Sequence, residues 1–296
     1  MTSLSEIPSR PSPSRITTAS DNEVYVSPRH LAGSTAYGDP GLQPALDSGW
    51  KISYDDHGNV LLPSPDQRIR IGYLPEGDDD ALWKIAAYQS PFEAPRWAAA
   101  FSSDCPTEFV TAFTSALVPL HEPEGNAFLT GGIGPRLHPV FPVLKPLLDA
   151  GWKLPQTWRH PELRSPDGLA GAWFDRSSLD PAGELTSNHT RWGMWGGSSY
   201  GRWYAVFSTG TPTRLITATA AAVADPTPVL RWPGELSRMT RARATITPVR
   251  PPAPTPLEMA RARRPVSALR TITVPRWSTS TPSARLPGPS RPAARR

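Results

Sequence analysis

The stretch LDSGWK at residues 46–51 returns almost unchanged as LDAGWK at residues 148–153. Three further matches occur in the same order in both halves: PRHL (28–31) with PRLH (135–138), SPD (64–66) with SPD (165–167), and RWAAAFSSDCPT (96–107) with RWYAVFSTGTPT (202–213). Self-similarity that keeps its order along a chain is typical of a duplicated structural unit. The sequence therefore predicts one fold that is built twice.

Each copy carries the same predicted elements. A short helix ends at Gly49 or Gly151, because glycine readily adopts the left-handed conformation that terminates a helix. Segments such as RIRIGYL (68–74) alternate polar and apolar residues, as a strand with one buried face does. A helix with apolar residues four positions apart follows Pro106 and Pro212. We expect an α+β fold of two tandem repeats, each with a short helix, an antiparallel meander of about four to five strands and a closing helix.

The composition sets the expected boundaries. We place the first repeat at residues 24–120 and the second at 134–230, with a linker at 121–133. Residues 1–23 are rich in Ser, Pro and Thr, and residues 231–296 are rich in Pro and Arg. Such segments cannot bury enough apolar surface to become ordered. Both tails are therefore predicted to be disordered.

Charge is unevenly distributed along the 296 residues. Residues 231–296 contain 14 Arg and two acidic residues, whereas residues 1–230 contain 17 basic and 24 acidic residues and so carry a net charge of −7. Arg binds phosphate through a planar, bidentate fork, so the tail is predicted to contact nucleic acid or another polyanion; the alternative is a solubilising extension. The candidate contacts in the tail are Arg241, Arg243, Arg261, Arg263 and Arg264.

Aromatic residues gather in RWGMWGGSSYGRWY (191–204). Rings interleaved with Arg on a sheet are typical of single-stranded nucleic-acid or peptide platforms. The alternative is that the rings fill the core of a small sheet domain. The candidate binding residues in this stretch are Trp192, Trp195, Tyr200, Arg202 and Trp203.

The sequence lacks the residues that several kinds of site would need. Cys105 is the single cysteine, which excludes a disulfide within the chain and a Cys-based zinc site. The six histidines show no ligand-like spacing, so we expect no metal and no cofactor. The N-terminus lacks a secretory signal, and no apolar run is long enough to cross a bilayer. We expect a cytoplasmic protein without a membrane partner.

The duplicated pattern resembles the SPDY family, a domain of unknown function found in actinobacteria, typically in two copies per chain. The resemblance rests on the pairs Gly49-Trp50 and Gly151-Trp152, the triplets 64–66 and 165–167, and the segments LWKIAAY (82–88) and RWAAAF (96–101). The Tyr that follows the family's triplet is replaced by Gln67 and Gly168. The resemblance implies the repeat and supplies no activity.

These patterns favour a non-catalytic binding or interaction protein whose partner is a protein or nucleic acid, with no catalytic residue. A second hypothesis is an enzyme with a site between the repeats, using residues such as Asp167, His189 and Ser199. Ser199 lies in GSSYG (197–201), which fits the esterase pattern, but its flanks are strand-like. A third is an oligomeric scaffold.

Overall fold

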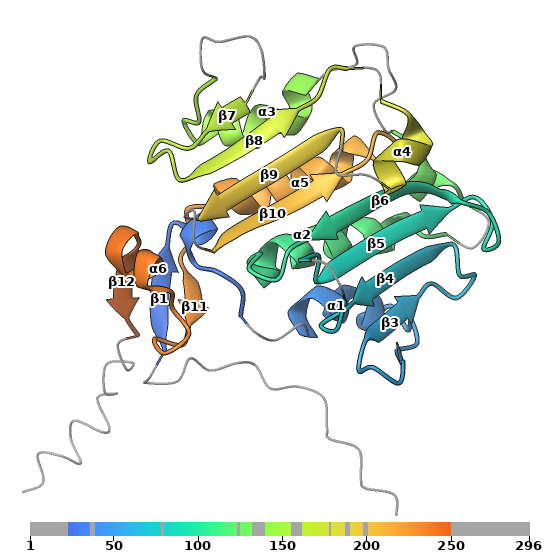
Figure 1. Cartoon of the computed structure of the whole chain (residues 1–296), viewed down its shortest axis with the longest axis horizontal. Helices are drawn as coiled ribbons and strands as arrows, with labels where there is room; N and C mark the ends of the chain where they lie inside the picture. The colour runs from blue at the N-terminus through green and yellow to red at the C-terminus, as the bar shows by residue number, and fades with distance from the viewer. Residues whose placement is uncertain are drawn as a thin grey trace, which may run out of the picture. The chain divides into compact units, whose positions relative to one another are not determined.

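The computed structural model describes residues 23–35, 39–77, 80–122, 125–131, 140–154, 162–177, 179–186, 190–197 and 201–249. These residues form a mixed α+β fold around an antiparallel sheet of nine strands, in the order β2-β3-β4-β5-β6-β10-β9-β8-β7 (Figure 1). The first repeat contributes β2 (Ser53–Tyr54), β3 (Val60–Pro63), β4 (Ile69–Tyr73), β5 (Trp83–Tyr88) and β6 (Pro95–Phe101). The second contributes β7 (Glu162–Arg164), β8 (Ala170–Phe174), β9 (Trp192–Gly197) and β10 (Arg202–Phe207). The predicted fold class, two α+β repeats with antiparallel meanders, is confirmed.

The two repeats join edge to edge through β6 and β10, and the strand register shows a local two-fold relation between them. Ala100 pairs with Val206, its own equivalent in the other copy. The contacts on either side are reciprocal: the backbone N–H of Ala98 donates to Ser208 Oγ, and that of Tyr204 donates to Ser102 Oγ, each at 2.9 Å. The shared Ser after each Phe in the repeated stretch therefore fastens the two halves together.

The helices of both repeats cover one face of the sheet, behind the strands in Figure 1. They are α1 (Asp39–Asp47), α2 (Thr107–Leu117), α3 (Val140–Asp149) and α5 (Thr213–Ala224). Under them lies one continuous core that includes buried residues of both repeats. Phe101, Phe113 and Phe207 meet at the centre, with ring centroids 5.6 to 5.8 Å apart. The repeats thus share one core.

The stretch that opens the sequence comparison ends the first helix of each repeat. The N–H of Trp50 donates to the carbonyl of Ala45, and the N–H of Gly49 donates to that of Leu46. These two bonds form a Schellman motif, which places the glycine in the left-handed region; Gly49 has φ 81° and Gly151 has φ 83°. The residue after the glycine is a tryptophan that is 5 % exposed in both copies. LDSGWK and LDAGWK recur because they stop a helix and anchor the next segment in the core.

A second sheet of three strands joins the two ends of the described chain. β1 (Val24–Ser27) lies between β11 (Val229–Arg231) and β12 (Thr245–Pro248), antiparallel to both. The short helix α6 (Arg238–Arg243) connects the two outer strands. The expectation that the chain has no fold from residue 231 onward is therefore wrong for residues 231–249. Strand pairing with β1, which propensity within the tail does not reveal, orders this segment.

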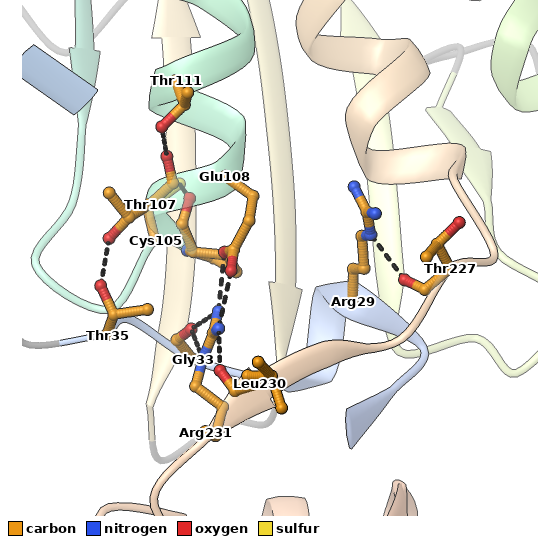
Figure 2. Close-up of polar contacts among 11 residues, drawn as sticks. Arg29, Gly33, Thr35, Cys105, Thr107, Glu108, Thr111, Thr227, Leu230 and Arg231 are labelled. Atoms are coloured by element: carbon orange, nitrogen blue, oxygen red, sulfur yellow. Dashed lines mark hydrogen bonds and ion pairs between the residues drawn. The ribbon is translucent and has the colours of Figure 1, made fainter. Parts of the chain in front are cut away.

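The buried Arg231 fixes this small sheet to the body. Its guanidinium donates to both carboxylate oxygens of Glu108 at 2.7 Å and to the Gly33 carbonyl at 2.9 Å (Figure 2). Glu108 lies in the first turn of α2, where the helix dipole also favours a negative charge. Nearby, Arg29 donates to the Thr227 carbonyl (Figure 2). Charged hydrogen bonds thus hold the terminal segments in place.

Each repeat is completed by a segment that carries a 3₁₀ turn. η3 (Ala127–Leu129) serves the first repeat, where Trp97 Nε1 donates to the Phe128 carbonyl at 2.8 Å. η1 (Arg29–Leu31) serves the second repeat, where Trp203 Nε1 donates to the His30 carbonyl at 2.9 Å. Residues 29–31, assigned to the first repeat by their place in the sequence, therefore pack against the second.

Candidate functional site

Among the described residues, the face of the sheet opposite α1, α2, α3 and α5 is open over its central strands. Buried residues alternate with half-buried or exposed ones along β5, β6 and β10, and the buried set belongs to the core beneath the helices. The other set therefore points to the open face. On β5 and β6 this set is Lys84, Ala86, Tyr88, Arg96, Ala98 and Ala100.

A groove of about 1360 Å³ lies on this open face. Its floor is made of small side chains on the three central strands: Ala86, Ala98, Ala100 and Val206. Larger residues line it from both repeats, among them Leu61, Arg70, Leu74, Lys84, Trp173, Leu185 and Tyr204. The helix α4 (Pro181–Thr186), which follows β8, contributes Glu184 and Leu185 to the lining.

The second repeat covers its own part of the open face with two tryptophans. A Cβ on Gly193 would lie 1.8 Å from the Trp173 ring, and a Cβ on Gly171 would lie 2.5 Å from Trp195 Nε1. Both rings therefore lie against the sheet at places where only glycine leaves room. The Arg202 guanidinium lies 4.3 Å from the Trp195 ring centroid on the same face. This half of the face is filled by its own side chains.

The first repeat holds small residues at the corresponding positions. Trp83 pairs with Phe101 as Trp192 pairs with Phe207, so Ala86 of β5 corresponds to Trp195 of β9. By the same register Gly72 corresponds to Trp173, because Lys84 and Gly193 are their respective partners. Ala98 likewise corresponds to Tyr204. At these three positions the first repeat has Gly or Ala where the second has Trp or Tyr, whereas Gly171 and Gly193 correspond to Arg70 and Lys84, which line the groove.

Basic residues are concentrated on this face, although residues 1–230 carry more acidic than basic residues. The strand residues of the open face include one carboxylate, Glu162, which accepts hydrogen bonds from Trp195 Nε1 and Arg164. Its basic residues are Arg70, Lys84, Arg96, Arg164 and Arg202. The strands of the open face thus carry more basic than acidic residues, on a body that is negative as a whole.

The aspartates of the two SPD triplets make the same contacts in both repeats. Asp66 accepts from Ser64 Oγ, from the Arg68 N–H and, at 2.9 Å, from His121 Nε2. Asp167 does the same with Ser165, Leu169 and, at 2.8 Å, His30. In both cases the carboxylate lies between the hydroxyl and the imidazole. A Ser–His–Asp nucleophile needs the imidazole in the middle, so these groups shape turns and anchor distant segments.

The protonation states follow from burial and these bonds. Burial raises the pKa of Asp66 and of Asp167, but the hydrogen bonds from Ser, backbone and His outweigh it and hold both pKa values below the usual range. Burial lowers the pKa of His30 against the opposing effect of Asp167. At neutral pH His30 is therefore uncharged, and its Nε2–H donates to the ionised Asp167, which can only accept.

The residue that follows each SPD triplet has a positive φ. Gln67 has φ 60° and Gly168 has φ 70°. Both positions are in the left-handed region, which suits Gly168 and strains a residue with a Cβ such as Gln67.

The structure separates the aromatic candidates into two groups. Trp192 and Trp203 are each 1 % exposed and belong to the core, so their rings offer no surface to a partner, and the core alternative holds for them. Trp195 is half-buried on the open face beneath Arg202. Tyr200 lies outside the described residues.

The candidates of the basic tail are described only in part. Arg241 and Arg243 lie exposed in the last turn of α6, and Arg241 donates to the Pro233 carbonyl. Arg261, Arg263 and Arg264 lie outside the described residues.

Among the residues that could carry chemistry, the structure describes Cys105 and Asp167. Cys105 is 1 % exposed, and burial, reinforced by the Glu108 and Asp104 carboxylates, raises the pKa of its thiol well above the usual value. His189 and Ser199, of the enzyme hypothesis, lie outside the described residues, and Asp167 is held by the contacts given above. Within the described part of the chain no three His, Cys, Asp or Glu side chains are grouped as a metal site would require.

Comparison with known proteins identifies the repeated unit. Residues 63–122 and 164–229 each match SPDY, a domain of unknown function (DUF317). The chain carries two SPDY domains. Each match begins at the last residue of the strand before the SPD triplet and continues through the meander and the closing helix. No curated protein and no solved structure matches the chain. Across the described ranges, no helix has both the length and the apolar character needed to cross a bilayer.

The sequence comparison contained a signal for the groove. Aligning the two SPDY domains residue by residue places Ala86 and Ala98 opposite Trp195 and Tyr204. Large-to-small differences at open-face positions of a repeat indicate a hollow on one copy alone. The identities shared by the copies, which first draw attention, instead mark core and turn positions.

Proposed function

We propose that this chain is a non-catalytic interaction protein whose open sheet face, on the first SPDY domain, binds a macromolecular partner. The observation that supports this most directly is the groove floored by Ala86, Ala98, Ala100 and Val206. A fold has no structural need for such a hollow, because the second domain fills the equivalent surface with its own tryptophans.

The size and lining of the groove favour a macromolecule over a metabolite. Small-molecule sites usually enclose about 300–1,000 Å³ and bury most of the ligand. This groove is larger, at about 1360 Å³, and lies open across several strands. Its floor is apolar, so recognition depends on burial of apolar surface, with charged residues at the margin.

Selection from a displayed library of random 16-residue peptides tests the proposal. The full-length chain is the target, and a variant with the groove filled by the second domain's own residues, A86W/A98Y, is the counter-target. A221W makes the same kind of change on an exposed position of the helical face and is the matched control.

We expect enriched clones to bind wild type and A221W equally and to bind A86W/A98Y at least about tenfold more weakly, a loss of about 1.4 kcal/mol. Circular dichroism and urea midpoints verify that the filled variant is folded; if it is not, A98Y alone replaces it. Enrichment of clones that ignore the filled groove, or no enrichment over background, would refute the proposal.

A second, independent proposal concerns the basic segment. Arg241 and Arg243 are exposed on α6, at the start of a region rich in Arg, and we propose that this region contacts polyanions such as nucleic acid. Fluorescence anisotropy with single- and double-stranded DNA and RNA across a salt series measures this; binding that weakens steeply with salt is expected. If the full chain does not bind any of these nucleic acids at low salt, the proposal for the basic segment is refuted. The cytoplasmic location stays a prediction.

A further inference from the structure

We infer that the occupant of the groove is an acidic amphipathic α-helix of a partner protein. This inference rests on the proposed function of the open face and specifies the chemistry of its partner.

The backbone of the groove floor is not available to a partner. β5 pairs with β4 and β6, and β6 pairs with β5 and β10, so both edges of each floor strand are occupied by ladder hydrogen bonds. An extended peptide that adds a strand to a sheet needs a free edge. A partner on this floor meets side chains alone, and a helix, whose own backbone bonds are satisfied internally, meets that condition.

The dimensions of the floor fit one helix. Its small residues lie on three adjacent strands, β5, β6 and β10, which span about 10 Å at the usual strand spacing of roughly 4.8 Å. A helix with side chains is about 10–12 Å across. On the opposite face α2 already packs its buried Phe109 and Phe113 into the core beneath these strands. A partner helix would complete a third layer on a sheet that has helices on one face.

The basic residues on the strands of the open face outnumber the carboxylates on that face and in the groove lining, which favours an acidic helix. Arg70 lies beside Ala86 across β4 and β5, and Lys84 lies beside Ala100 across β5 and β6. Arg96, the second residue of β6, and Arg202, the first of β10, add positive charge to the open face outside the groove lining. The lining also contains Asp80 and Glu184, and Glu184 accepts hydrogen bonds from the N–H and Oγ1 of Thr209.

The same charges disfavour the chain's own C-terminal segment. Residues 250–296 contain ten Arg and one acidic residue, Glu258, so their charge has the same sign as that of the open face. A nucleic acid has the negative charge that the open face favours. Its bases, however, stack on exposed aromatic rings. The floor presents methyl groups, and the Trp195 ring lies between Gly171 and Arg202.

The experiment characterises the groove-dependent clones from the random library. We expect more acidic than basic residues in them, apolar residues at helical spacing, and a rise in helical circular dichroism on binding to the full-length chain. R70E reverses one charge at the groove margin. It should weaken an acidic clone by about three- to tenfold at low salt, since a charge contact is worth about 1 kcal/mol, and it should strengthen the matched clone in which Glu is replaced by Lys.

The outcomes separate the inference from the proposed function. If the groove-dependent clones are basic, or bind without gaining helical structure, the inference of an acidic helix is wrong. The proposal that the open face binds a partner is then still supported. A single-stranded dT20 probe that binds wild type and is lost in A86W/A98Y assigns the groove to nucleic acid and overturns the helix as well. If no clone and no oligonucleotide depends on the groove, both proposals fall.

Discussion

Replacing Arg231 by Met should destabilise the protein by about 3 kcal/mol, because breaking a buried ion pair costs roughly 3–5 kcal/mol. The Arg231 side chain is 1 % exposed and makes hydrogen bonds to Glu108, Gly33 and Leu230. Met approximates its volume but leaves the Glu108 carboxylate without its cation. The Glu108 side chain is 29 % exposed, so its carboxylate regains some hydration, which places the cost at the lower end of the range.

Removing the other partner with E108Q leaves the Arg231 guanidinium buried with its charge uncompensated. This change should lower the free energy of unfolding by at least as much as R231M. The double variant R231M/E108Q should be less destabilised than the sum of the two by 1 kcal/mol or more, since residues in one network do not add. Urea unfolding gives these energies; with a slope of about 3 kcal/mol/M, R231M shifts the midpoint by about 1 M.

The exposed pair Lys145–Asp149, with side chains 61 % and 62 % exposed, provides the matched control. Removing it with D149N should cost no more than about 0.5 kcal/mol. The reasoning fails if R231M stays within about 0.5 kcal/mol of wild type, or if the two single effects simply add. Either result would mean that the three-stranded sheet is not held to α2 by this pair.

Three further predictions concern other parts of the body. F101A, at the centre of the joined sheet, should cost about 3–5 kcal/mol, whereas F92A, which truncates a fully solvated ring, should cost almost nothing; equal urea midpoints would contradict a shared core. Cys105 should react with a thiol reagent in urea but not in buffer, since burial both shields it and raises its pKa; rapid labelling of the folded protein would show otherwise. The pKa of His30 is lower in the folded state than its unfolded value of 6.5, so the unfolded chain binds the extra proton and stability falls as pH drops below 6.5. H30Q should flatten this pH dependence between pH 7 and 5, and an unchanged slope in urea unfolding would count against it.

The repeat and its elements could be predicted because their signals are local. These signals act within a few residues: a glycine that ends a helix, an alternating strand pattern, and a proline at a helix start. Because the unit is duplicated, each signal occurs twice in the sequence. The joining of the two sheets through β6 and β10 is not local, since it depends on pairing between positions about a hundred residues apart. The buried roles of Trp192 and Trp203 follow from which face of the strand they occupy, which the alternation within RWGMWGGSSYGRWY does not reveal.

The fate of Arg231 shows the same limit. Read within its neighbourhood, it is the first of many arginines in a proline-rich stretch, and a disordered tail is the natural expectation. Its order comes from Glu108 and from β1, which lie more than a hundred residues earlier in the chain. The composition of a segment indicates whether that segment could fold on its own. It gives no information about strands or charged residues elsewhere in the chain that pair with the segment.

η1 supplies His30 to Asp167, and β1 is paired on both sides by strands from the far end of the body, so these early segments gain their partners only after the later ones have been synthesised. The first residues of the body to leave the ribosome have no complete binding site until residue 248 has emerged. A nascent chain halted after the first SPDY domain therefore keeps an unsatisfied β-strand at its leading end. Unpaired strand edges of this kind make incompletely folded chains prone to aggregation.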